Sequence, residues 1–320
     1  MITLVTPCYN EEENVRNFYN EVMRVFKENN LSWEVVFVND GSSDKTLDNL
    51  RLLNKEHANV KVVSFSRNFG KDAAIYAGLI KAEGDLVCII DADLQQRPEV
   101  VVEMHKKLIS SDDVDCVVAY QKKRRERRLM SFLKSRFYKT INRISDTKFV
   151  NGASDFRLMK RTMVDAIINM PEYNRFSKGI FSYVGFNCVY MPYVAEERQF
   201  GKSKWNGFKL FRYAFDGIFS FSTRPLKFAT HTGICASLGA IIYFFVVFIK
   251  KIFWGIELPG YATIVILILL LGGAQLFCLG ILGEYIAKIF IETKKRPIYI
   301  IKEELKAQEK IEAKDEIQVA

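Results

Sequence analysis

Residues 86–98 read LVCIIDADLQQRP, and this stretch decides the fold class of the chain. Its five apolar residues, Leu86 to Ile90, predict a buried strand, and Asp91 and Asp93 follow at alternating positions. Because side chains alternate between the two faces of a strand, both carboxylates are expected to project to one side. Two carboxylates and the amide oxygen of Gln95 suit Mg²⁺ or Mn²⁺. The stretch therefore predicts a metal site for a nucleotide diphosphate, although a solvated turn after a strand would show the same acidic spacing.

Apolar strands alternate with amphipathic helices along the first part of the chain. Besides residues 86–90, strands are predicted at residues 2–6, 33–38, 60–65 and 114–119. Such alternation over short connections is typical of a mostly parallel sheet covered by helices. Ligands bind beyond the carboxyl ends of the strands in these sheets. The polar segments TPCYNE, VNDGSSD and DADLQ all follow such ends, so one edge of the sheet is the predicted site.

The net charge of +9 predicts a negatively charged partner. Positive charge is concentrated in residues 122–128 (KKRRERR) and beside two long apolar runs, which favours a membrane over nucleic acid. Six cysteines without a C-x-x-C pair and three scattered histidines indicate reduced thiols rather than disulfides or a zinc site. The N-terminus has no basic region before an apolar core, so no cleaved signal peptide is predicted.

The two apolar runs, residues 228–249 and 262–283, predict a membrane hairpin. As helices each would span about 33 Å, enough for a hydrocarbon core of about 30 Å. Basic residues flank the outer ends of the pair more than the connector, so both termini and the N-terminal domain are predicted to be cytoplasmic. Aromatic and basic residues at helical spacing before the first run predict an interfacial helix. The second run carries small residues on which helices can approach and oligomerise, namely Gly272, Gly273, Gly280 and Gly283.

These features predict four parts of the chain. They are an α/β domain (1–205), an amphipathic interfacial region (206–227), two transmembrane helices (228–290) and a cytoplasmic tail (291–320). Segments 152–161 and 196–205 are polar and too rich in charge to be ordinary core. The tail from Glu303 is charged and short of aromatic residues, which predicts a frayed helix or disorder.

The polar motifs together resemble those of one enzyme family. No G-x-x-x-x-G-K-[ST] loop and no G-x-G-x-x-G fingerprint is present. In order, TPCYNEEEN, VNDGSSDKT, RNFGKDAA, DADLQQRPE, SDFRLMKR, RQFGKSKW and FSTRPL resemble the motifs of the family 2 glycosyltransferases that charge polyprenyl phosphates. These are the dolichol-phosphate mannose synthases and bactoprenol glucosyltransferases. The resemblance covers residues 1–300, and two spans after the catalytic domain make the bactoprenol branch the most similar one.

The resemblance implies a GT-A fold, a Rossmann-like mostly parallel sheet, with a divalent cation, Mg²⁺ or Mn²⁺. It implies inverting transfer of a hexose, glucose from UDP-glucose in this branch, to undecaprenyl or another polyprenyl phosphate. The reaction would take place at the cytoplasmic face of the inner membrane and supply a polyprenyl-phosphate sugar for cell-envelope glycans. A homo-oligomer, with a tetramer possible, is also carried over from the family.

Site residues follow from the same resemblance, position by position. On the donor side, Asp91 would lie at the ribose or the metal, and Asp93 and Gln95 would ligate the metal. Arg198 would contact the diphosphate, with Lys204 nearby. The base and ribose would be held by Pro7, Tyr9, Glu11 and Asp40.

On the acceptor side, the lipid phosphate would be bound by Lys122, Arg127 and Ser131. Asp155 resembles the family's carboxylate near the acceptor. It would orient the phosphate or accept a residual proton, although an ion pair with Arg157 or Arg161 is the alternative. The phosphate monoester has a second pKa near 6 and arrives mostly ionised, so no strong base is required. The catalytic residues implied are thus Asp155, Asp93 and Arg198.

Other functions stay open at the level of sequence. GDP-mannose, UDP-N-acetylglucosamine or an aminoarabinose donor would use the same motifs. A processive polysaccharide synthase shares the D-x-D domain, but its Q-x-x-R-W motif is absent here and two spans are few for a polymer channel. A membrane-anchored sensor of nucleotide sugars would keep the base-binding motifs without needing Asp155, Arg198 and the basic run together.

Overall fold

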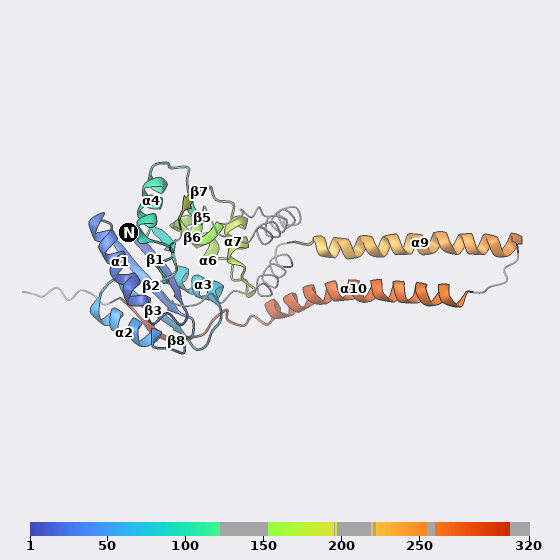
Figure 1. Ribbon diagram of the computed structural model, residues 1–320, viewed down its shortest axis with the longest axis horizontal. Helices are drawn as coiled ribbons and strands as arrows, with labels where there is room; N and C mark the ends of the chain where they lie inside the picture. The colour runs from blue at the N-terminus through green and yellow to red at the C-terminus, as the bar shows by residue number, and fades with distance from the viewer. Residues whose placement is uncertain (122–152, 195, 197–218, 220–221, 255–259, 308–320) are drawn as a thin grey trace, which may run out of the picture. The chain divides into compact units, whose positions relative to one another are not determined.

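A computed structural model describes residues 1–121, 153–194, 196, 219, 222–254 and 260–307 (Figure 1). Two compact units are present. The first holds the sheet, and residues 297–320 group with it although they follow the second unit in the chain. The second consists mainly of residues 207–296.

The first unit is built on an eight-stranded mixed sheet in the order β7-β5-β6-β4-β1-β2-β3-β8. Parallel pairing joins β4, β1, β2 and β3 at its centre. The strands are β1 (Ile2–Cys8), β2 (Trp33–Asn39), β3 (Val60–Phe65), β4 (Leu86–Ile89), β5 (Cys116–Gln121), β6 (Ala153–Lys160), β7 (Cys188–Tyr193) and β8 (Ile301–Leu305). The α/β class with a mostly parallel sheet is therefore confirmed.

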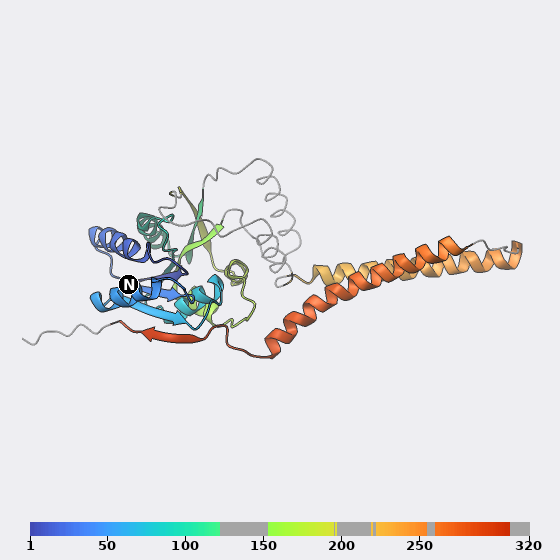
Figure 2. The same ribbon diagram turned by 60° about the horizontal axis from the view of Figure 1, so that its bottom comes forward.

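Helices cover both faces of this sheet (Figures 1 and 2). The main core lies between the sheet and three of them, α1 (Val15–Glu28), α2 (Thr46–Glu56) and α4 (Pro98–Ile109). On the other face α3 (Lys71–Lys81) packs its alanines on β2 and β3. The central strands are apolar on both faces because both are covered. The remaining helices of this unit are α6 (Arg161–Ile168) and α7 (Ser177–Tyr183).

Most of the segment 152–161, predicted to lie outside the ordinary core, instead forms β6, which covers residues 153–160. This strand runs antiparallel between β4 and β5, and its Phe156 and Leu158 are fully buried. Arg157 alternates with them and is itself only 4% exposed. The charged residues between the apolar ones gave no sign of an inner strand in the sequence. In the structure the guanidinium of Arg157 is accommodated over the ring of Phe181, 3.7 Å from its centroid.

The prediction of a frayed helix or disorder from Glu303 was also wrong for residues 303–305. They belong to β8 (residues 301–305), which pairs antiparallel with β3 at the edge of the sheet. Ahead of this strand, Tyr299 stacks on Phe65 with ring centroids 4.8 Å apart. Glu303 then pairs with Arg51 at 2.6 Å and Glu304 with Lys81 at 2.7 Å. Charged side chains are common on edge strands, so the composition of β8 is the same as that expected of a solvated tail.

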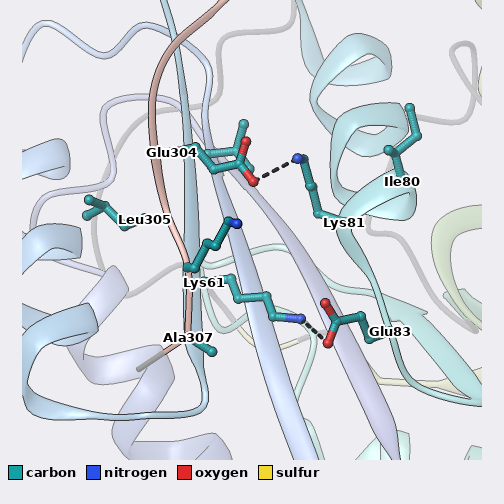
Figure 3. A pocket seen from close by; sticks show the side chains of 9 residues that line it. Lys61, Ile80, Lys81, Glu83, Glu304, Leu305 and Ala307 are labelled. Carbon is teal, nitrogen blue, oxygen red and sulfur yellow. Dashed lines mark hydrogen bonds and ion pairs between the residues drawn. The ribbon is translucent and has the colours of Figure 1, made fainter. Parts of the chain in front are cut away.

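A pocket lies beside this edge strand (Figure 3). The ion pairs of Lys81 with Glu304 and of Lys61 with Glu83 cross its lining. None of the predicted site residues lines it. We therefore place the candidate site elsewhere, at the carboxyl ends of the central strands.

The second unit contains α9 (Arg224–Trp254) and α10 (Tyr261–Thr293), each long and apolar enough to cross a membrane. They contact each other where the Cys278 thiol donates to the carbonyl of Ala229, and the Tyr285 hydroxyl of α10 donates to the carbonyl of Ser222, just before α9. Most of their apolar side chains are exposed, as in a helix pair that meets lipid. A methyl group added at any of the four glycines of the second run would meet no atom of another described segment within 4 Å, so no described part of the chain packs closely on them.

Candidate active site

The loop after β1 and the loop after β2 are joined by hydrogen bonds. The amide of Asn10 donates to the Ser42 hydroxyl, and the Ser43 amide donates to the side-chain oxygen of Asn10, at 3.0 and 2.9 Å. Asn10 has a φ of 56°, a conformation that asparagine tolerates well. The amide of Glu11 donates to the hydroxyl of Thr46 at 2.8 Å. Tyr9 and Glu11 thus lie on a loop with a defined conformation, and Pro7 lies near the end of β1 just before it.

Asp40 supports a third loop at the same edge. Its carboxylate is buried and accepts the backbone N–H groups of Phe69 and Gly70 at 2.6 and 3.0 Å. Burial raises the pKa of Asp40, against the effect of these hydrogen bonds and of the Arg67 charge. Asp40 therefore holds the RNFG segment in place, and its contact with a nucleotide stays a prediction.

Gly41, next to Asp40, fits closely against that segment. Its φ is +64°, and an added Cβ would lie 2.3 Å from the carbonyl carbon of Arg67 and 2.6 Å from the nitrogen of Asn68. We expect Gly41→Ala to lower the free energy of unfolding by about 2 kcal/mol or more, through overpacking against backbone atoms and a strained φ. Urea unfolding of the purified protein, followed by near-UV circular dichroism, measures this change.

Gly185→Ala is the matched control. Gly185 has a φ of +73°, but its added Cβ would meet only the Tyr183 carbonyl oxygen at 3.9 Å. Both variants carry the strain of a positive φ, and only Gly41→Ala adds the clash. Equal losses of stability in the two variants would contradict the close packing of the two loops.

The predicted metal residues follow β4 on a tight turn. Asp93 is 9% exposed and accepts the amide of Gln95 at 3.2 Å. Leu94 between them has a φ of 56°, which is rare for a branched residue and typical of strained functional turns. The Gln95 side chain donates to the carbonyl of Glu196 at 3.3 Å, and the Glu196 amide donates back to the Gln95 carbonyl. Glu196 is two positions before Arg198 in the sequence.

Asp155 reaches the same edge from the antiparallel strand β6. Ile89, the last residue of β4, pairs with Arg157. Asp91 lies two residues beyond Ile89 and Asp155 two residues before Arg157, which brings the two carboxylates to the same edge. The ammonium of Lys71, the first residue of α3, lies 2.6 Å from one oxygen of Asp91 and 3.7 Å from Asp155. The alternative ion pairs of Asp155 are not found among the described residues. Arg157 donates to backbone carbonyls, and Arg161 pairs with Asp165.

The charges around Asp155 favour its ionised form. Burial alone would raise its pKa, but the cations of Lys71, Lys178 and Arg157 outweigh burial and lower the pKa. One of its oxygens, Oδ1, is buried without a hydrogen-bond partner among the described residues. An ionised carboxylate with an oxygen to spare is suited to orient a donor group or accept a proton.

Asp72 adds a second buried carboxylate next to Lys71. It accepts the amide of Ser177 at 3.1 Å and so fixes the start of α7 against α3. Burial, and then the charge of Asp155, raises its pKa. The interpretation of the motif RNFGKDAA identified neither Lys71 nor Asp72 as a site residue, although both lie within it. Two adjacent charged residues at the start of a helix, beside the predicted ligand-binding edge, were the signal that could have identified them.

The structure thus brings together part of the predicted set. Asp91 and Asp155 meet through Lys71, and Asp93 and Gln95 share the turn after β4. Pro7, Tyr9, Glu11 and Asp40 lie on the neighbouring strand β1 and the loops that follow β1 and β2. The basic residues expected around the donor diphosphate and the acceptor phosphate lie outside the described residues, namely Lys122, Arg127, Ser131, Arg198 and Lys204. Most of the interfacial region 206–227 does too.

The donor set at the β4 turn fits a hard divalent cation. It offers two carboxylates and one amide oxygen, and no third His, Cys, Asp or Glu joins them among the described residues. Oxygen ligands of this kind leave room for diphosphate oxygens around Mg²⁺ or Mn²⁺. A positive charge, the ammonium of Lys71, already faces both oxygens of Asp91 at 2.6 and 2.8 Å. The turn is therefore a place that attracts cations.

Comparison with known proteins adds independent information. A family model described as glycosyl transferase family 2 matches residues 3–168, and one described as GtrB C-terminal hairpin matches residues 224–289. A prophage bactoprenol glucosyl transferase homolog of Escherichia coli (strain K12) is 42% identical over 305 residues, 94% of this chain and 98% of that protein. The bactoprenol glucosyl transferase of Shigella phage SfV is 42% identical over 307 residues, 95% of this chain and 98% of that protein.

Solved structures are more distant. The complex of glucosyl-3-phosphoglycerate synthase from Mycobacterium tuberculosis with Mg²⁺ and UDP has a TM-score of 0.49 and 16% sequence identity, and the match covers 68% of this chain and 77% of that one.

Proposed function

Since the chain belongs to glycosyl transferase family 2 and has a GT-A-like fold, we propose that it transfers glucose from UDP-glucose to undecaprenyl or another polyprenyl phosphate. The observation that carries this proposal is the meeting of Asp91, Lys71 and Asp155 at one edge of the sheet, in a chain that continues into two apolar helices. Relatives named bactoprenol glucosyl transferase, at 42% identity over nearly their whole length, support the acceptor and the sugar.

The donor would bind across the carboxyl ends of the central strands. The loop of Tyr9 and Glu11 and the loop of Asp40 would hold the base and ribose. Asp93 and Gln95, with Asp91 at the ribose or the metal, would hold Mg²⁺ or Mn²⁺. When bound, this ion supplies positive charge to the diphosphate that leaves. Arg198 and Lys204 would add further positive charge there.

The acceptor phosphate would reach the same edge from the membrane. Its second pKa is about 6, so the attacking oxygen is mostly ionised at neutral pH. Asp155, which is also ionised, would hold a residual proton or a hydrogen-bonding group of the acceptor in line with the anomeric carbon. Lys122, Arg127 and Ser131 would bind the phosphate. Direct displacement would form the bond from the phosphate oxygen to the anomeric carbon, break the bond to the nucleoside diphosphate and invert the configuration.

We further propose that the protein is a multi-pass protein of the cytoplasmic membrane, with the catalytic domain and both termini on the cytoplasmic side. The two helices would anchor the domain, and basic residues near the surface would concentrate the anionic lipid, by about 1 kcal/mol for each residue. Nucleic acid is no partner in this proposal. A homo-oligomer, including a tetramer, is compatible with it.

The test incubates membranes containing the protein with polyprenyl phosphate, Mn²⁺ and a panel of labelled donors. We expect a chloroform-soluble labelled product with UDP-glucose, and no product when the acceptor or the metal is left out. The same product with GDP-mannose, UDP-N-acetylglucosamine or an aminoarabinose donor would change the sugar and keep the reaction class. Insoluble polymer would indicate a processive synthase. Tight nucleotide binding without any product would indicate a sensor and would contradict the proposal.

A further inference from the structure

Lys71 bridges two carboxylates that come from different strands. Its ammonium lies 2.6 and 2.8 Å from the two oxygens of Asp91 and 3.7 Å from Asp155. The motif resemblance and the matched relatives assign it no role. Asp91 is one of the residues proposed to face the divalent cation. In the structure its carboxylate is already paired with a cation of the chain itself, the Lys71 ammonium.

The backbone before Lys71 is fixed by the fold. Asp40 accepts the amides of Phe69 and Gly70, and Gly70 enters the helix with a φ of +100°. The loop that Asp40 supports therefore delivers the Lys71 ammonium to the two carboxylates.

We propose that Lys71 is a positioning residue, the resident counter-ion of Asp91, which a divalent cation has to displace from that carboxylate. This inference rests on the proposed function, in which Asp91 lies at the metal. An ammonium and a metal ion on the same carboxylate compete for its oxygen lone pairs, and they repel each other at short range. The repulsion disfavours metal binding until the diphosphate of the donor adds negative charge, so metal and donor bind together. The displaced ammonium remains with Asp155.

The experiment measures Mn²⁺ affinity without any nucleotide, from the electron paramagnetic resonance signal of free Mn²⁺ over the full-length protein in detergent. We expect Lys71→Met to bind Mn²⁺ about tenfold more tightly than the wild type, because one nearby positive charge is gone. Lys71→Arg is expected to bind it about threefold more weakly, because a guanidinium grips a carboxylate through two hydrogen bonds. The two variants shift the affinity in opposite directions, which general loss of structure would not do.

Lys178→Met is the matched control. Lys178 also places a positive charge near Asp155, but it makes no ion pair with Asp91 in the structure. Its removal is expected to change Mn²⁺ affinity by less than threefold. In the transfer reaction, kcat of Lys71→Met should fall, whereas Lys71→Arg should keep most of the wild-type kcat, because only the second variant keeps a positive charge between Asp91 and Asp155.

Unchanged or weaker Mn²⁺ binding by Lys71→Met would overturn the inference, and so would equal tightening by Lys71→Met and Lys178→Met. Asp91→Asn separates this failure from failure of the proposed function. If Asp91→Asn binds Mn²⁺ as well as the wild type, the metal does not use this carboxylate and the proposed site is wrong. If Asp91→Asn loses Mn²⁺ while Lys71→Met binds it unchanged, only the role of Lys71 fails.

Discussion

Asp93→Asn should reduce kcat/KM for the nucleotide sugar by about a thousandfold or more. Asp93 is buried on the turn after β4, where its oxygen accepts the amide of Gln95. An asparagine oxygen can keep that hydrogen bond, so the turn is retained and only the negative charge is lost. Without this charge the site holds a divalent cation poorly, and the leaving diphosphate loses its main electrostatic stabilisation. Initial rates with varied donor and Mn²⁺ measure the effect.

Asp85→Asn is the control for this prediction. Asp85 immediately precedes β4, at the opposite end of the strand, and pairs with the amino group of Met1 at 2.9 Å. The same substitution there should leave the transfer rate unchanged. If Asp93→Asn turned over at the wild-type rate in thoroughly chelated buffer, the metal site would have to be abandoned.

Asp155→Asn is expected to lower kcat by about a hundredfold to a thousandfold, with the affinity for the donor nearly unchanged. The reason is that Asp155 lies on β6 and carries an ionised carboxylate with an oxygen that lacks a partner among the described residues. Asparagine fills the same volume but can neither accept a proton nor balance the cations around it. Separate measurement of kcat and of donor binding tests this division of roles.

Asp72→Asn removes a charge from the same neighbourhood at a position that faces the amide of Ser177. We expect kcat to fall less than tenfold in this control. A large rise in the donor KM of Asp155→Asn with an unchanged kcat would indicate that Asp155 contacts the donor rather than the acceptor.

Short-range pattern was enough to predict strand β4 and the acidic turn that follows it. Asp91 and Asp93 directly follow an apolar strand, and alternation along a strand needs no knowledge of the rest of the chain. Local reasoning also placed the polar segments after β1, β2 and β4 at the carboxyl ends of neighbouring parallel strands, as the structure shows. The same local reasoning located the two long apolar helices, because their length and hydropathy are properties of the segment alone.

Pairing between distant segments was beyond local pattern. The ion pair of Asp91 with Lys71 depends on α3 beginning beside the end of β4. The ion pair of Lys71 with Asp155 depends on the insertion of β6 between β4 and β5. The charged residues of β6 and β8 have the composition of a polar loop and of a solvated tail. Pairing with β4 and β3 gives these segments their strand conformation, and local pattern does not show that pairing. Long-range strand pairing thus explains both what was missed in the fold and what was missed in the site.

The central claim is that Asp93 holds a divalent cation against the diphosphate of the sugar donor. Electron–nuclear double resonance of the protein with Mn²⁺ and the nucleoside diphosphate product reports direct contact, because ³¹P nuclei of metal-bound phosphates couple to the Mn²⁺ electron spin. The account predicts ³¹P coupling in the wild-type protein and its loss in Asp93→Asn at saturating nucleotide. Absence of the coupling in the wild type, or the same coupling in Asp93→Asn, would contradict it.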